Sequence, residues 1–251
     1  MYYKVEGKGR SLLFIHGLSD NLLYWNILAA HLRDDYQIIR IDLRGHGSTD
    51  LGTDKISIGL FVNDLKKLLD ELNIKKVDLI GFSLGGAIAL DFSIKYPDMV
   101  SSIVLMSSFA KSDDYLTDVF IQLKNALKAG FETYYDLILP LILCPEVIND
   151  NKSELEYIKK AASKTANTGA YIKAIDACLD FNVENELSVI DVPVLILAGR
   201  YDGISLLDSQ MNLQKKIANS RLFIFDNVKH NLLIGENVND VVNILKDFYE
   251  S

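Results

Sequence analysis

The chain of 251 residues has little of several features that mark specialised classes of protein. Its two cysteines, Cys144 and Cys178, form no C-x-x-C pair and no metal-ligand spacing, so we expect two free, packed thiols. The longest apolar run, residues 137–144, is broken by Pro140 and is too short to cross a bilayer. No basic cluster exceeds a pair of lysines and the net charge is −8, so nucleic acid is not an expected partner.

The first residues, MYYKVEGKGR, lack the apolar segment and cleavage site of a secretory signal peptide, and we therefore expect a cytoplasmic protein. Apolar residues make up 49% of the chain, which is ample for a sizeable core. The length suits one large domain or a domain with an insertion. The sequence leaves the oligomeric state open, and a homodimer is compatible with it.

One stretch, residues 76–96, organises the rest of the chain. It begins with a short apolar run typical of a strand buried on both faces of a parallel sheet, and continues with apolar residues at helical spacing. Between them, residues 81–85 read G-x-S-x-G, where Gly81 and Gly85 permit a turn too sharp for side chains. We expect this turn to strain Ser83 and to place it at the positive end of a helix. The alternative is a glycine-rich turn whose serine only caps the helix.

Strand and helix patterns alternate along most of the chain. Buried strands are predicted over 11–15, 37–41, 77–80, 103–106, 192–198 and 221–225, with an edge strand over 2–5. Between about 111 and 180 the periodicity is helical, over 114–129, 131–143, 153–164 and 168–179. We predict an α/β fold with a doubly wound, mostly parallel sheet built from residues 1–109 and 181–251. Residues 110–180 are then a helical cap inserted above the carboxyl ends of the strands, where such sheets bind ligands.

A serine hydroxyl needs a base to accept its proton, and that base is usually an oriented histidine. His31 falls within a predicted helix, and His46 lies in a glycine-rich loop. His16 lies at a strand end, where we expect the backbone and not the side chain to serve the site. His230 follows the last strand, at the sheet edge where the turn at Ser83 also opens. We therefore predict His230 as the base, against the alternative of a surface loop histidine.

The third group of a triad is a buried carboxylate at another strand end. Asp202 follows the strand over 192–198 and fits that position, with Asp113 and Asp114 as the alternatives. Asp226 is closer to His230 in sequence, but its position is that of a residue that terminates the last strand. The order Ser83, Asp202, His230 is that of nucleophile, acid and base in the α/β-hydrolases.

An oxyanion hole requires backbone N–H groups aimed at the carbonyl oxygen that becomes negative. Leu84, directly after the serine, supplies one from the start of a helix. Leu18 is the natural second, because Gly17 allows the backbone at the end of the neighbouring strand to approach closely. The alternative for residues 16–18 is an ordinary β-turn.

Together, His16-Gly17, residues 42–47 (DLRGHG), residues 81–85 (GFSLG), residues 199–202 (GRYD) and His230 resemble the α/β-hydrolase superfamily. The resemblance covers nearly the whole chain outside the helical block and is nearest to small capped esterases, enol-lactonases and cofactor-free haloperoxidases. Two positions depart from the family pattern. Thr49 stands where the family usually has serine, and Lys229 precedes the histidine where glycine is usual.

The resemblance implies a serine carboxylesterase for a small, neutral, moderately apolar ester, with no metal and no organic cofactor. Dehalogenases and epoxide hydrolases of the family use aspartate at the position of Ser83. All six arginines lie outside residues 110–180, which argues against a cation for a dicarboxylate substrate. An enol-lactonase or a C–C bond hydrolase remains the alternative within the family, and a non-catalytic ligand receptor the alternative outside it. The cap offers apolar residues for an acyl pocket, among them Phe120, Tyr134 and Leu141.

Overall fold

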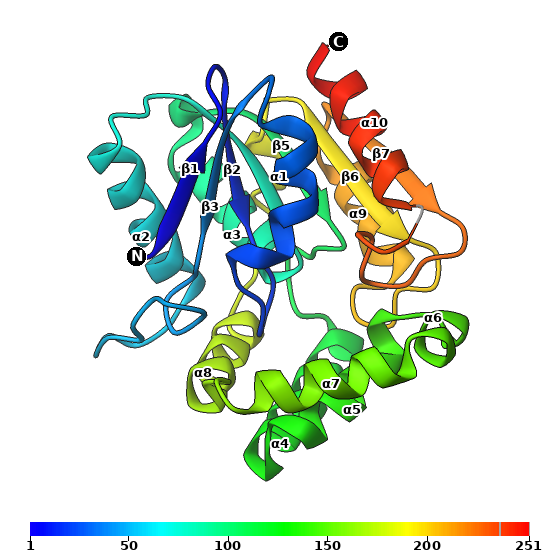
Figure 1. The fold of residues 1–251 in the computed structure, drawn as a ribbon. Coiled ribbons are helices and arrows are strands. Elements are labelled where there is room, and N and C mark those ends of the chain that lie inside the picture. The colour runs from blue at the N-terminus through cyan, green and yellow to red at the C-terminus, as the bar shows by residue number, and fades with distance from the viewer. Residues whose placement is uncertain (236, 251) are drawn as a thin grey trace.

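The computed structural model describes residues 1–235 and 237–250. A seven-stranded sheet crosses the molecule in the order β1-β3-β2-β4-β5-β6-β7 (Figure 1). The edge strand β1 (Tyr3–Glu6) is antiparallel to β3 (Gln37–Ile41), and every other neighbouring pair is parallel. The other strands are β2 (Ser11–Ile15), β4 (Val77–Phe82), β5 (Val100–Met106), β6 (Val194–Gly199) and β7 (Ser220–Phe225).

Helices cover both faces of the sheet because its strands are apolar on both sides. Leu13 and Ile15 of β2 face one core, with α2 (Ile58–Glu71), α3 (Leu84–Lys95) and α9 (Leu207–Lys216). Leu12 and Phe14 face the other core, with α1 (Asn26–Leu32) and α10 (Asn237–Glu250). This alternation confirms the predicted doubly wound sheet. Short 3₁₀ helices are η1 (Leu22–Trp25), η2 (Pro97–Met99) and η3 (Leu187–Val189).

Five helices between β5 and β6 form what we call the helical insertion. They are α4 (Asp114–Ala129), α5 (Phe131–Ile142), α6 (Pro145–Asp150), α7 (Lys152–Ser163) and α8 (Thr168–Leu179). In Figure 1 they gather below the sheet, at the end where β5 leads into α4. The sequence predicted four of these helices and missed α6, because α6 is one and a half turns long and buries no side chain.

The segment after β2 does not lead directly into α1. It begins with the 3₁₀ turn η1, because two side chains fix its first backbone N–H groups. Asn21 Oδ1 accepts from the Leu23 N–H at 2.9 Å, and Asp42 Oδ1 accepts from the Leu22 N–H at 2.8 Å. The same Asp42 accepts from the Ser48 N–H at 2.7 Å, so it joins the loops after β2 and β3. No helix in the described part of the chain is long and apolar enough to cross a membrane.

Candidate active site

Ser83 stands at a sharp turn between β4 and α3. Its φ of 51° and ψ of −115° lie in a region that L-residues rarely adopt, and such strain costs about 1–3 kcal/mol. Neither flanking glycine tolerates a side chain. A Cβ on Gly81 would overlap the carbonyl of Gly85, and a Cβ on Gly85 would overlap the carbonyl of Ile15 on β2. The close packing of α3 on the sheet therefore forces the turn that raises Ser83 from the end of β4.

Ser108, in the loop after β5, supports this turn from behind. Its hydroxyl donates to the Ser83 carbonyl oxygen at 2.8 Å, and it lies so close to Gly86 that only glycine fits there. The Ser108 carbonyl in turn accepts from Ser205 Oγ at 3.0 Å and from Gln210 Nε2 at 2.5 Å. Sequence analysis missed this buried network. The only signal for it was the polar pair 107–108 at the end of an apolar strand.

His230 and Asp202 form a buried pair at the same edge of the sheet, 3% and 4% exposed. Asp202 follows β6 and His230 lies in the loop after β7. Nδ1 of His230 is 2.9 Å from Oδ1 and 2.8 Å from Oδ2 of Asp202. Oδ1 also accepts from the N–H groups of Ile204 at 2.8 Å and Ser205 at 3.0 Å. These bonds hold the Asp202 carboxylate in place. Because the carboxylate accepts a hydrogen bond from Nδ1, the imidazole carries its proton on Nδ1, and Nε2 is free to accept a proton.

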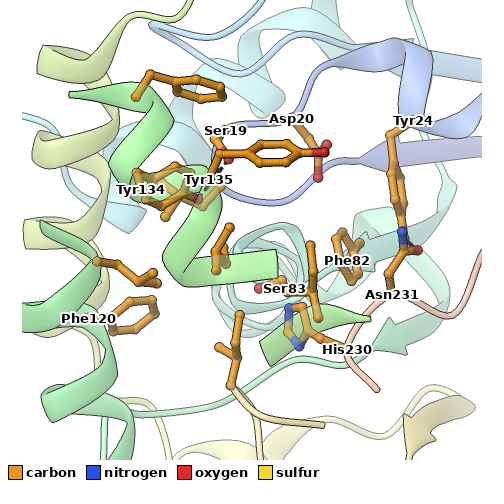
Figure 2. Close-up of a pocket in the computed structure, with 16 residues that line it drawn as sticks. Ser19, Asp20, Tyr24, Phe82, Ser83, Phe120, Tyr134, Tyr135, His230 and Asn231 are labelled. Carbon is orange, nitrogen blue, oxygen red and sulfur yellow. Dashed lines mark hydrogen bonds between the residues drawn. The ribbon is translucent and has the colours of Figure 1, made fainter. Parts of the chain in front are cut away.

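Ser83 and His230 line one cavity, and Figure 2 shows them next to each other. The structure has no hydrogen bond between the Ser83 hydroxyl and the imidazole. Such bonds are often long in the absence of substrate and shorten in the reacting complex. What the structure brings together is a strained serine, an oriented histidine and the carboxylate that orients it.

The other predicted carboxylates have different partners. Asp113 caps α4, where its Oδ1 accepts from the Leu116 N–H at 2.9 Å, and Asp114 lies in the first turn of the same helix. Asp226 ends β7 and pairs with Arg200 at 2.6 Å on the surface.

The remaining histidines do not line the cavity. His31 is exposed on α1. His16 and His46 are buried side by side, with ring centroids 5.3 Å apart. Nε2 of His16 accepts from the Leu43 N–H at 3.0 Å, so its Nδ1 carries the proton and donates to the Gly17 carbonyl at 2.7 Å. Burial lowers the pKa of His16 to about 4 and that of His46 to about 3, so both stay neutral. The two bonds of His16 join the loop that bears Leu18 to the loop after β3.

Leu18 and Leu84, the predicted oxyanion donors, flank the serine. Leu18 lines the cavity, and Leu84 is the first residue of α3. In the described part of the chain, the N–H groups of both residues make no backbone hydrogen bond. Gly17 is packed so closely against the Phe82 ring that a Cβ there would lie 2.9 Å from it, so glycine is needed for this approach.

The cavity has a volume of about 130 Å³, and the helical insertion supplies much of its apolar wall (Figure 2). Phe120 and Tyr134 line it as expected, whereas Leu141 does not. A larger groove of about 750 Å³ adjoins the cavity and shares four of its residues. Side chains from the insertion that line the cavity are Phe120, Leu123, Phe131, Tyr134, Tyr135, Ile138 and Ile142.

The end of α5 is also bonded to the loops that carry Asp202 and His230. Carbonyl groups in the last turn of a helix lack partners within the helix. Here the Leu141 carbonyl accepts from the Gly203 N–H and the Ile142 carbonyl from the Asn231 N–H, each at 3.1 Å. Lys229 Nζ donates to the Pro140 carbonyl at 2.5 Å. The insertion therefore both walls the cavity and steadies the two loops, a role that sequence analysis did not anticipate.

The structure accounts for the two positions that depart from the family pattern, Thr49 and Lys229, and for the state of the two cysteines. The Thr49 hydroxyl donates to the Asp42 carbonyl at 2.8 Å, so it still ties this loop together. Lys229 makes the contact to α5 just described. Cys144 and Cys178 are free thiols. No cluster of metal-ligating side chains occurs within residues 1–235 and 237–250.

Comparison with known proteins assigns the family. A family model described as the alpha/beta hydrolase fold matches residues 10–236, so the chain belongs to the α/β-hydrolase family. A solved α/β hydrolase from a Medee basin deep-sea metagenome library shares the fold with a TM-score of 0.93 and 22% identity, covering 100% of this chain and 94% of that one.

Two curated relatives extend this result. An uncharacterized protein of Mycobacterium tuberculosis is 33% identical over 141 residues, 56% of this chain and 40% of its own length, so this chain spans well under two thirds of it. The (E)-2-((N-methylformamido)methylene)succinate hydrolase of Acinetobacter baylyi is 27% identical over 250 residues, 96% of this chain and 92% of that protein. Family and relatives together support a hydrolase.

Proposed function

We propose that the protein is a serine carboxylesterase that cleaves small, moderately apolar esters through an acyl-enzyme. The observation that carries this proposal is the buried pair of Asp202 and His230 beside a strained Ser83 in one largely apolar cavity. Burial and the hydrogen bonds to Asp202 hold the imidazole in the tautomer that can accept a proton from serine.

In the proposed mechanism, Ser83 Oγ attacks the ester carbonyl carbon while its proton passes to Nε2 of His230. Asp202 stabilises the imidazolium that forms. The N–H groups of Leu18 and Leu84 bind the oxygen that becomes negative. His230 then gives the proton to the leaving alcohol, and the C–O bond breaks to leave an acyl-serine. A water molecule, deprotonated by the same histidine, releases the carboxylic acid and restores Ser83.

The charge of the cavity favours an ester over the alternative substrates. Among the described residues that line it, no lysine or arginine is present, and Asp20 contributes an acidic side chain. A substrate with a distal carboxylate, such as a succinate derivative or the product of ring cleavage, would enter without a cation to pair with it. The cavity therefore disfavours enol-lactones and C–C cleavage substrates that carry carboxylates. The intact set of reacting groups disfavours a non-catalytic receptor.

A substrate panel tests the proposal. Purified protein is assayed with p-nitrophenyl esters from acetate to decanoate, with neutral lactones, and with a dicarboxylate enol-lactone. We expect turnover of the shorter esters, weaker turnover of lactones and none of the dicarboxylate. A preference for the dicarboxylate would replace the esterase by an enol-lactonase. A protein that binds these compounds but turns over none of them would be a receptor.

A further inference from the structure

Asp20 has no role in the proposed mechanism, yet it faces the cavity where the reaction would occur. It lies three residues beyond Gly17, in the loop that follows β2, and lines both the cavity and the adjoining groove. In the described part of the chain, no hydrogen bond or ion pair reaches its carboxylate. Figure 2 shows Asp20 toward the top of the view and His230 toward the bottom, with Ser83 between them.

The groups around Asp20 do not neutralise it. The Tyr24 hydroxyl donates to Asn231 Oδ1 at 3.2 Å, and the Tyr134 hydroxyl is bonded to Ser19 Oγ at 2.8 Å. Both phenols are therefore engaged elsewhere. No described lysine or arginine lines the cavity, and Lys229, which lines the adjoining groove with Asp20, donates to the Pro140 carbonyl. Asp20 is half-buried, and a carboxylate in that position without a partner loses part of its hydration, a cost that a ligand of opposite charge would offset.

Aromatic rings complete the surroundings. Tyr24, Phe82, Phe131, Tyr134 and Tyr135 line the same cavity as Asp20. The faces of aromatic rings attract cations, most strongly where water is excluded. An unpaired carboxylate among aromatic rings is the chemistry that holds an organic ammonium group.

We propose that Asp20 is a specificity-determining residue that selects esters carrying an ammonium group close to the scissile bond. The inference rests on the proposed esterase function and names its substrate class. It also replaces the neutral ester expected from the sequence by a cationic one. Because Asp20 lies at the junction of cavity and groove, the ammonium group can belong to either the acyl or the alcohol part, and the experiment separates the two.

The attraction between Asp20 and an ammonium group should depend on pH. Burial raises the pKa of Asp20 from 3.8 to about 7, and nearby His230 opposes this shift. The phenols near it are Tyr24, Tyr134 and Tyr171, whose pKa values burial raises and the charge of Asp20 raises further. These phenols stay neutral below pH 9. Glu154 and Lys229 line the adjoining groove with it. Only ionised Asp20 attracts a cation, so selectivity for the cation should increase as pH rises through about 7.

The test uses pairs of esters that differ only in charge. For the alcohol side, acetylcholine is compared with 3,3-dimethylbutyl acetate. For the acyl side, the p-nitrophenyl ester of 4-(trimethylammonio)butanoate is compared with that of 5,5-dimethylhexanoate. In each pair a quaternary nitrogen replaces a quaternary carbon, so size and reacting carbonyl are matched. The readout is the ratio of kcat/KM for the cationic and the neutral ester, in which any general effect on Ser83 or His230 cancels.

We expect the wild-type ratio to be tenfold or more in at least one pair, and Asp20→Asn to reduce it to about one. Asp98→Asn, which removes an exposed carboxylate at the opposite end of the sheet, is the matched control and should keep the wild-type ratio. Between pH 6 and 8 the wild-type ratio should rise by up to about tenfold, because the ionised fraction of a group with a pKa of about 7 rises by that factor. Asp20→Asn should show no such rise.

Ratios near one in both pairs, flat with pH, in an enzyme that hydrolyses the neutral esters would overturn the inference and leave the esterase proposal intact. A wild-type ratio that survives in Asp20→Asn would assign the preference to the aromatic rings and would also overturn it. Absence of turnover for every ester would contradict the proposed function itself. If Asp20→Asn does not fold, the pH dependence of the wild-type ratio still decides the question.

Discussion

Replacing Asp202 by asparagine probes the geometry of the site most finely, because it changes one atom and leaves the shape almost unaltered. Oδ1 of Asp202 accepts from two backbone N–H groups, at 2.8 and 3.0 Å, whereas Oδ2 contacts the His230 ring alone. An asparagine therefore keeps its oxygen on the backbone side and presents its NH₂ group to Nδ1. Nδ1 must then act as an acceptor, and the imidazole proton moves to Nε2.

In that tautomer His230 cannot accept the proton of Ser83, and it also loses the carboxylate that stabilises the imidazolium. We expect Asp202→Asn to lower kcat by about 10⁴-fold, equivalent to about 5.4 kcal/mol in the activation barrier. The change should affect kcat far more than KM, because Asp202 acts on the transition state through His230 and does not itself line the cavity.

The assay is p-nitrophenyl acetate hydrolysis by wild type and variant, with thermal unfolding to show that both are folded. Asp113→Asn is the matched control, since that carboxylate caps α4 and should leave kcat unaltered. Near wild-type turnover of Asp202→Asn, or a large loss in Asp113→Asn, would refute the assignment of the acid.

Three further predictions concern the cavity, the insertion and the buried histidines. Ile138→Ala should enlarge the cavity and favour longer acyl chains by roughly 10–200-fold in relative kcat/KM across the ester series. Tyr157→Ala, at an exposed site of the insertion, should leave the acyl-chain preference unaltered. The same acyl-chain preference in both variants would make the insertion a purely structural cover. Lys229→Met should lower kcat about fivefold with little change in thermal stability, because it removes the side-chain bond between the loop of His230 and α5. An unchanged kcat would show that the backbone hydrogen bonds alone hold this loop in place. The free energy of unfolding should fall as pH drops below 6.5, by about 1.4 kcal/mol per pH unit for each buried histidine. The reason is that both histidines bind a proton in the unfolded chain, whereas in the folded state His16 (pKa about 4) and His46 (pKa about 3) remain neutral. His46→Gln should reduce that slope by the contribution of one histidine in urea unfolding at pH 6.5, 5.5 and 4.5, and an unaltered slope would contradict the assigned pKa.

Much of the fold could be predicted because its signals are local. The strand before Ser83, the glycines at positions 81 and 85 and the helix after them lie within twenty residues, so the whole pattern that predicts the turn is local. Chain order then limited the choice of acid and base, because residues that follow parallel strands meet at one edge of the sheet. This is why Asp202 and His230 could be paired without any knowledge of their distance.

What could not be predicted depends on contacts between distant segments. The 3₁₀ start of η1 is fixed by Asp42, twenty residues further on, and no local pattern contains that bond. The support of Ser83 by Ser108 and the bonds of α5 to the loop at His230 likewise join separate elements. Asp20 was overlooked because a charged residue in a loop usually faces solvent, and its place in the cavity becomes visible only in three dimensions.

The central claim is that Ser83 forms a covalent acyl-enzyme, and labelling with a fluorophosphonate probe tests it most directly. Such probes react with serines that an adjacent base activates. Peptide mass spectrometry should find the added mass on the peptide that contains Ser83, with loss of esterase activity in step with labelling. Ser83→Ala should remain folded, lose labelling and lose about 10⁶-fold in kcat. A label on another serine, or an active protein that takes up no label, would contradict the account.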